Sequence, residues 1–494
     1  MSTTSSSRIA LFLSGVLFMA PLACGVENNG TTSSQDDMGE VVKDMSTTSP
    51  EDQDSTTPVD MPDEGTTPDT GPDESDLSDL SDMMVPDQGS DMASPGQTTY
   101  HQDIKPLMNK YCMRCHDTGG QGPIDFSDAG TVVTLGELVL SQVESGEMPP
   151  PVADPSCRDY ESSDHLSMAA ADIELLKSWV ADGKPLGVDD GVPARAPESA
   201  VFEDADLELR LTQPYTPTYE DPRNPNNEYR CFALEHGQDK TFYITGLHPL
   251  VDQTDIVHHV VLAKLPRDKA PAETLTAQGQ DCISDMSAIS GGGSPTGGML
   301  AGWAPGMEPI EFDGAGLEVK PDEVLIIQMH YYADREENMN IADQSGYAFK
   351  IADRVRNPIS MYPLGTGSFT IPAGDDNYTT TDELSLPLGV TLWGVFPHMH
   401  VLGKAYDMKV EMNGQDTCLV DGPDYDFNNQ VTYMFKEPVY IPGGSPISYS
   451  CTWNNSPSNP ALIHNPPIDV GYGERTDEEM CFMFSYVSLG QRRN

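Results

Sequence analysis

The sequence predicts a multidomain protein in which a small all-α domain precedes two all-β domains, each an antiparallel, jelly-roll-like sandwich. Length, periodicity and turn residues support this prediction. The chain has 494 residues, enough for roughly two to four domains. Apolar residues recur at helical spacing in short segments of residues 99–187. Residues 203–494 instead contain short apolar or alternating runs separated by Gly, Pro, Asn and Asp.

The first 24 residues have the pattern of an export signal. Arg8 precedes an apolar run from Ile9 to Pro21, which is too short for an ordinary membrane span. The residues Leu22-Ala23-Cys24 resemble the processing site of bacterial lipoproteins, although Leu22 lies one place later than that family prefers. We therefore expect an exported protein of the bacterial cell envelope, attached to a membrane only through a lipid on Cys24. A plain secretory signal, cleaved nearby, is the alternative.

Residues 25–98 are predicted to be a disordered linker between this anchor and the folded domains. They contain 19 acidic side chains and a single basic one, Lys43, with many Thr, Ser and Pro and almost no aromatic residues. Such a segment cannot bury an apolar core. The whole chain has a formal net charge of −51, so its surface repels phosphate backbones and nucleic acid is excluded as a partner.

The predicted α domain, residues 99–187, is clearest at 172–180. This segment begins with Asp172, keeps apolar residues at helical spacing, and is followed by Gly183 and a proline, which end a helix. A shorter helix is expected over 103–111. Residues 188–200, which are rich in Gly, Pro, Asp and Ala, are predicted to link this domain to the β domains.

The segment from Cys112 to His116 reads Cys-Met-Arg-Cys-His, which is the attachment pattern of a c-type haem. Two thiols at this spacing can add to the two vinyl groups of the haem, and His116 would then bind the iron. The alternatives for Cys112 and Cys115 are a disulfide and a zinc site. The whole segment resembles the small cytochrome c domains of bacterial surface proteins.

In those cytochromes, a methionine from a later loop often supplies the second axial bond to the iron. The sequence Gly146-Glu147-Met148-Pro149-Pro150 resembles that loop, so we expect Met148 to be this ligand. A thioether ligand raises the haem potential, which suits electron transfer. The other candidates are His101, His165 and Met168.

Residues 203–354 and 355–494 are the two predicted β domains, with the join near 350–358. The clearest expected strands are Val257–Lys264, Val324–Tyr332, Thr391–Phe396 and Met480–Val487. Many short strands separated by turn residues are typical of antiparallel sandwiches, and nearly 290 residues are long for only one of them.

Three groups of histidines lie within these expected strands. His398 and His400 are two residues apart, so both side chains would face the same way on a strand and share a metal. His258 and His259 are adjacent and would need a bulge or local twist to do so. His330 ends an apolar run, where an unpaired imidazole would be costly. Each group alone is more often structural than metal-binding.

In order along the chain, these groups and their neighbours resemble the copper type II, ascorbate-dependent monooxygenases, the family of peptidylglycine hydroxylating and dopamine β-monooxygenases. The resemblance covers residues 205–490. The segments that carry it are Glu228-Tyr229-Arg230-Cys231, His258-His259-Val260-Val261, Gln328-Met329-His330-Tyr331, Pro397-His398-Met399-His400-Val401-Leu402-Gly403, Asp424-Tyr425-Asp426-Phe427, and residues 473–481 with Glu479-Met480-Cys481.

The resemblance implies two copper ions. His258, His259 and His330 match the ligands of the copper that stores an electron. His398, His400 and Met480 match the ligands of the copper at which O2 binds and the substrate is hydroxylated, and they are the expected catalytic residues. A thioether favours Cu(I), the state that must meet O2.

The resemblance also implies two disulfides, Cys231 with Cys282 and Cys451 with Cys481. Cys157 and Cys418 then remain, either paired across domains or free. Together with the haem segment, these matches predict an oxidoreductase that uses O2, a small-molecule substrate, and electrons from an ascorbate-like reductant or a cytochrome, passed on through the fused haem.

The sequence departs from the peptidylglycine enzymes at the residues that hold the substrate carboxylate. Where those enzymes have an Arg, an Asn and a Tyr, this chain has Phe396, Phe482 and Phe484. We therefore expect an apolar or aromatic substrate. One alternative is a surface lipoprotein whose haem and copper only store or relay electrons. The other is a structural module whose histidines bind no metal.

Overall fold

The computed structural model describes residues 96–493, except for 119, 121, 123, 162, 197–201, 221–225, 283–297 and 334. The expected export signal, Cys24 and almost all of the expected acidic linker lie outside the described residues. Among the described residues, no helix is both long and apolar enough to cross a membrane.

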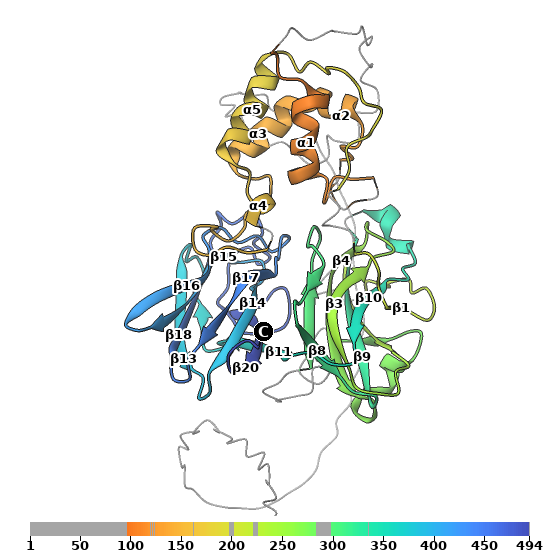
Figure 1. The fold of residues 1–494 in the computed structure, drawn as a ribbon, viewed down its shortest axis with the longest axis vertical. Coiled ribbons are helices and arrows are strands. Elements are labelled where there is room, and N and C mark those ends of the chain that lie inside the picture. The colour runs from red at the N-terminus through yellow and green to blue at the C-terminus, as the bar shows by residue number, and fades with distance from the viewer. Residues whose placement is uncertain are drawn as a thin grey trace, which may run out of the picture. The chain divides into compact units, whose positions relative to one another are not determined.

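Short helices occupy residues 100–181 (Figure 1), and all but the one at Ser163–Leu166 contribute to one apolar core. They are η2 (Tyr100–Ile104), α1 (Lys105–Leu107), η3 (Met108–Cys112), α2 (Ala129–Thr134), α3 (Gly136–Ser145), α4 (Ser163–Leu166) and α5 (Ala170–Ala181). The helix expected over 172–180 is the central part of α5, which ends before Gly183 because that residue has a φ of 84°. Trp179 of α5 is fully buried against Tyr100 of η2, at 6.2 Å between ring centroids. We call residues 99–187 the helical module.

The rest of the described chain is built from strands, with short 3-10 turns between some of them (Figure 1). The first set is β1 (Leu207–Arg210), β2 (Asn227–Leu234), β3 (Phe242–Leu250), β4 (Val257–Pro266), β5 (Gln280–Asp281), β6 (Met299–Trp303), β7 (Ile310–Glu311), β8 (Ala315–Val319), β9 (Glu323–Tyr332) and β10 (Gly346–Ala352). The second set is β11 (Asn357–Gly365), β12 (Thr370–Ile371), β13 (Tyr378–Ser385), β14 (Val390–His398), β15 (Gly403–Met412), β16 (Gln415–Gly422), β17 (Tyr433–Ile441), β18 (Pro446–Trp453), β19 (Val470–Gly471) and β20 (Phe482–Leu489).

Two apolar cores lie between these sheets. The first core joins the five-stranded sheet β5-β2-β9-β4-β6 to β3, β8 and β10. The second joins the four-stranded sheet β13-β18-β15-β16 to β11, β20, β14 and β17. Both cores therefore have the sheet-on-sheet arrangement of a β sandwich, as the turn-rich sequence predicts.

The two sandwiches are not separate sheets placed side by side, which is what the sequence pattern suggests. A nine-stranded sheet runs through both, in the order β1-β10-β3-β8-β11-β20-β14-β17 with β7 on β3. The junction is a parallel pair in which Asn357–Ile359 of β11 lies along Ala315–Leu317 of β8. The pairing depends on tertiary structure because β9 and β10 separate these strands in sequence.

The strand β9, which carries His330, lies at the centre of the five-stranded sheet and is buried on both faces. Its residues Val324 to Tyr331 are almost wholly buried, because one face of the five-stranded sheet packs into the main core and the other into a smaller cluster around the Cys231–Cys282 disulfide. A strand buried on both faces reads as a continuous apolar run rather than as an alternation. His330 lies near the end of this strand.

Three disulfides are present among the described residues. Cys231–Cys282 and Cys451–Cys481 are the two pairs that the family resemblance implied. Cys157 and Cys418, whose pairing the sequence left open, form the third, which links the helical module to β16 of the second sandwich. Cys112 and Cys115 are free thiols, so the disulfide alternative for this motif is not what the structure contains.

Candidate metal centres

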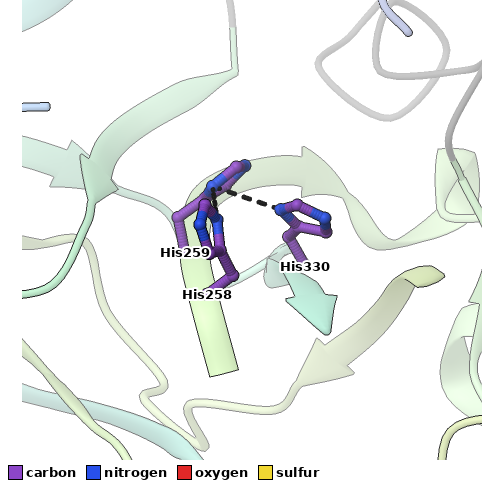
Figure 2. A group of neighbouring side chains, drawn as sticks. All are labelled: His258, His259 and His330. Carbon is purple, nitrogen blue, oxygen red and sulfur yellow. Dashed lines mark hydrogen bonds between the residues drawn. The ribbon is translucent and has the colours of Figure 1, made fainter. Parts of the chain in front are cut away.

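His258, His259 and His330 come together between the neighbouring strands β4 and β9 (Figure 2). His259 is the register partner of His330, and the pairing shifts between Val257 and His259. This irregularity is the bulge that two adjacent histidines need in order to face the same point. Their ligand nitrogens all lie within 4.8 Å of one another. We call these three residues the first centre.

The hydrogen bonds around the first centre decide which ring nitrogen faces inward. His330 Nε2 lies 2.7 Å from Asn227 Oδ1, and His258 Nε2 lies 3.2 Å from Asn428 Oδ1. An amide oxygen only accepts, so both Nε2 atoms carry the proton and both Nδ1 atoms have a free lone pair. The Nδ1 atoms of His258 and His330 lie 3.0 and 3.2 Å from Nδ1 of His259. Lone pairs converging at this distance suit a bound cation.

Burial keeps the imidazoles of the first centre neutral. The pKa of His259 and the pKa of His330 lie well below the usual value, first because burial penalises the charged ring and then because other histidines lie nearby. Burial likewise lowers the pKa of His258. A neutral imidazole is the form that binds a metal, so the protein supplies these three ligands ready for it.

His398, His400 and Met480 form the second group, which we call the second centre. His398 is the last residue of β14, and His400 lies in the turn beyond the strand, so the expected strand geometry holds only for the first of them. His398 Nδ1 lies 2.7 Å from Gln430 Oε1, and His400 Nδ1 lies 2.9 Å from the carbonyl oxygen of Glu478. Both Nδ1 atoms donate, which leaves the Nε2 atoms as ligands. Burial lowers the pKa of His400 to about 3.

Glu479 holds the backbone on both sides of the second centre. It is fully buried, and its carboxyl group accepts hydrogen bonds from the backbone N–H of His400, Leu402 and Met480 and from Trp453 Nε1, at 2.7–3.2 Å. Burial raises the pKa of Glu479 to about 7, while these N–H donors lower it. The side chain thereby connects the turn that carries His400 to the residue Met480.

One cavity of about 120 Å3 is lined by ligands of both centres. His259 of the first centre and His398, His400 and Met480 of the second all reach it. Most of its wall is apolar, with side chains that include Trp303, Phe396 and Phe484. Phe482 is not among the lining residues; its ring stacks on that of Phe484 at 5.6 Å. A small molecule in this cavity would lie between the two centres.

The segment Phe427–Gln430 contacts both centres. The Phe427 ring centroid lies 6.1 Å from that of His259 and 6.1 Å from that of His400. Asn428 bonds to His258, and Gln430 bonds to His398. The family resemblance includes Asp424–Phe427 but implies no role for the residues that follow. The amide side chains directly after this motif, and Glu479 directly before Met480, are the sequence features that could have indicated residues supporting the ligands.

In the helical module, His116 is held in an orientation suited to an axial ligand. Its Nδ1 lies 2.8 Å from the carbonyl oxygen of Ile124, and its ring stacks on Phe126 at 4.6 Å. Because a carbonyl only accepts, Nδ1 is protonated and Nε2 has the lone pair. Met148 is 40% exposed, and no contact that the structure describes joins it to His116. Met168 packs against the same apolar cluster as Cys112.

Six neutral or soft ligands form two groups of unequal chemistry, and four of them, His259, His398, His400 and Met480, line one cavity. The first offers three imidazoles; the second offers two imidazoles and a thioether. Such donors suit copper, and a thioether favours the Cu(I) state.

Comparisons with known proteins agree with this chemistry. Residues 366–488 match the family "Copper type II ascorbate-dependent monooxygenase, C-terminal domain". The chain is also 25% identical over 201 residues to dopamine beta-hydroxylase of Canis lupus familiaris; the match covers 37% of this chain and 31% of that relative. Residues 366–488 are therefore similar to the C-terminal domain of the copper type II ascorbate-dependent monooxygenases, and the match spans about a third of the length of the relative.

Two solved structures show a weaker likeness. The first is the major capsid protein P2 of bacteriophage PM2, at 7% identity, with 54% of this chain and 99% of that chain covered and a TM-score of 0.23. The other is the VP2 subviral particle of infectious bursal disease virus, at 8% identity, with 60% and 84% covered and a TM-score of 0.13. TM-scores this low carry no argument.

Proposed function

We propose that this chain is a copper monooxygenase that hydroxylates a C–H bond of a small apolar or aromatic substrate with O2, with electrons supplied through a c-type haem on its helical module. The observation that carries the proposal is the cavity reached by His259 from one side and by His398, His400 and Met480 from the other. A substrate there would lie against the second centre with the first centre close by.

The protein's part is to hold two copper ions with their ligands oriented. His258 and His330 would bind the copper that stores an electron through the Nδ1 atoms that Asn428 and Asn227 leave unprotonated, and His259 through the Nδ1 atom that faces both of them. His398 and His400, through Nε2, and Met480 would bind the copper at which O2 meets the substrate. When bound, these ions supply the redox chemistry that O2 activation requires.

The cavity wall favours a substrate without a negative charge. Phe396 and Phe484 line it where a carboxylate-binding enzyme would place cationic or polar groups. Glu474 is the only acidic or basic side chain among the described lining residues, histidines aside, and it would repel an anion. An aromatic or apolar substrate matches the flat, ring-lined wall.

The helical module fits a covalently attached haem. Cys112 and Cys115 are free, and His116 presents Nε2. Met148 remains the proposed second axial ligand, with Met168 as the alternative that lies beside the motif in the core. The haem would hand single electrons to the first centre. We further propose that the chain is exported and anchored to the bacterial envelope by a lipid on Cys24.

The test is metal and haem content of the full chain, combined with O2 consumption in the presence of ascorbate. We expect two coppers and one haem per chain, and consumption that depends on small aromatic compounds but not on their carboxylated analogues. Met480→Ala should lose or perturb one copper, while Met412→Ala, a partly buried methionine on β15, should keep both.

Three outcomes would overturn parts of the proposal. A chain that binds no copper after loading is not a copper enzyme. Copper and haem without any substrate-dependent O2 consumption would instead support the non-catalytic electron-carrying lipoprotein. Equal consumption with carboxylated and neutral substrates would contradict the assignment of the phenylalanine wall.

A further inference from the structure

The helical module is held against both β sandwiches by specific contacts, and the residues between its two haem cysteines take part. We propose that the Cys112–His116 segment docks on the loop 304–308 of the first sandwich and that electrons enter there, at Gly306. The proposal rests on the proposed function, because the electrons come from a haem attached to Cys112 and Cys115.

The first contact is an ion pair made by the haem motif itself. Arg114, between the two cysteines, places Nη2 at 2.7 Å and Nε at 3.2 Å from Glu308 Oε1. His165 of α4 lies 3.4 Å from the same oxygen. The Arg114 and Glu308 side chains are only 10% and 20% exposed, so solvent screens the pair less than it screens a surface salt bridge. An ion pair in this position fixes the orientation of the haem motif.

The second contact is made by the thiol that would carry the haem. Cys115 Sγ lies so close to Gly306 that a β-carbon there would be 2.7 Å from the sulfur. Gly306 also has a φ of 80°, a conformation that other residues rarely adopt. Glycine thus satisfies two requirements at this position, the backbone turn and the close approach of Cys115.

The loop that receives Cys115 leads directly to the cavity and to the first centre. It follows β6, whose last residue Trp303 lines the cavity, as does Ala304. Trp303 is the register partner of Val260 on β4, and Val260 follows His259 in the chain. Three steps along the chain, one strand pairing and one further chain step therefore connect the sulfur contact to a ligand of the first centre.

Contacts with the second sandwich hold the module in the same place. The Cys157–Cys418 disulfide joins the two covalently, and Arg158 Nη2 donates to the carbonyl oxygen of Cys418 at 2.8 Å. Asn429 Nδ2 donates to the carbonyl oxygen of Pro151 at 2.9 Å. Because the helical module is held at both sandwiches, a haem on it would transfer electrons within one molecule rather than through repeated encounters between separate molecules.

A second path is available in principle, from Pro151 through Asn429 and Asn428 to His258. It starts beyond Met148, which the structure leaves 40% exposed, whereas the Gly306 path starts at the thioether sulfur. We therefore assign entry to Gly306. With both groups bound, each transfer would take one electron from the haem iron, which would go from Fe(II) to Fe(III), and would reduce the copper of the first centre from Cu(II) to Cu(I).

The experiment follows haem oxidation in the full chain loaded with haem and copper. After rapid reduction of the haem by pulse radiolysis without O2, the decay of its reduced absorbance gives the rate of transfer. Gly306→Val and Glu308→Gln should slow this decay at least about tenfold, because they displace the donor from its acceptor. Exchanging the charges, Arg114→Glu with Glu308→Arg, should restore most of the rate lost in either single variant. Glu311→Gln, an exposed acid on β7, is the matched control and should leave the rate unchanged.

The docking itself has a readout that needs neither metal nor haem. Hydrogen exchange of residues 304–308 should be faster in Glu308→Gln than in the wild type, and normal again in the charge exchange. Unchanged decay in Gly306→Val and Glu308→Gln, in a fully loaded chain, overturns electron entry at Gly306 while leaving the proposed function intact. Slowing by Asn429→Ala alone overturns it in favour of the second path. A chain that takes up no haem overturns the electron route and the proposed haem supply together, and hydrogen exchange then decides the docking.

Discussion

Gln430 joins His398, at the end of β14, to the backbone of Phe427. Replacing Gln430 by methionine tests whether this connection contributes to copper affinity at the second centre. The side chain is 3% exposed; Oε1 accepts from His398 Nδ1 at 2.7 Å and Nε2 donates to the carbonyl oxygen of Phe427 at 3.0 Å. Methionine fills a similar volume, so no cavity is created, but both hydrogen bonds are lost. His398 is then free to move its proton to Nε2, the atom that must bind copper.

The size of the effect follows from the hydrogen bond to His398. A neutral hydrogen bond contributes about 1 kcal/mol and one to a charged partner about 1.5–3 kcal/mol, and an imidazole on copper is closer to the second case. The difference of about 0.5–2 kcal/mol corresponds to a roughly 2- to 30-fold loss of copper affinity at the second centre. Unfolding should also become easier by about 1 kcal/mol, because the part-buried Phe427 carbonyl loses its donor.

The assay is a copper titration against a competing chelator, with the two centres distinguished by their spectra. No described hydrogen bond joins Gln430 to a ligand of the first centre, so that centre serves as the comparison, and Gln415→Met at the exposed start of β16 is the control for the substitution. Equal loss at both centres would mean a general loss of structure. Wild-type affinity at the second centre would refute the argument that Gln430 fixes the tautomer of His398.

Three further changes test other parts of the structure. Gly302→Val should lower the free energy of unfolding by about 1–3 kcal/mol, because a β-carbon at Gly302 would lie 2.8 Å from the Phe396 ring; urea unfolding that matches the wild type would contradict this. Removing both Cys157 and Cys418 as serines should lower stability by about 2–5 kcal/mol under non-reducing conditions, and no difference would show that the bridge does not constrain the unfolded chain. Burial lowers the pKa of His248 from 6.5 to about 4, so the unfolded chain binds this proton first and stability should fall as the pH drops from 6.5 to 4. At pH 5 this amounts to about 1–2 kcal/mol for a half-buried ring, and His248→Gln should lack it in urea unfolding at pH 5 and 7.5.

The elements that could be predicted from sequence are those whose pattern is local. Helix α5 and strands β4 and β9 follow from the spacing of their apolar residues, and each lies within two residues of its expected bounds. The need for a bulge at His258 and His259 follows from the alternation of side chains along a strand. The structure has that bulge between Val257 and His259.

The features that escaped sequence reasoning depend on segments far apart in the chain. No local pattern shows that β8 and β11 pair in parallel, or that Cys157 lies against Cys418. The Phe427 ring near both centres is likewise a product of tertiary packing. His400 was expected on a strand, yet the strand ends at His398, because the hydrogen bonds of the next residues go to the Glu479 carboxyl group instead of a neighbouring strand.

The choice of ring nitrogen explains why two histidine groups in one protein can serve different purposes. In the first centre, Nε2 of His258 and of His330 is occupied by an amide oxygen, so the metal would bind at Nδ1, the nitrogen nearer to the backbone. A metal held there by His258, His259 and His330 would suit the storage of an electron that we propose for the first centre. In the second centre Nδ1 is occupied, so the metal would bind at Nε2, farther from the backbone and at the cavity that Met480 also lines. In the proposed function, the hydrogen-bond partners, more than the ligands themselves, would therefore decide which centre meets the substrate.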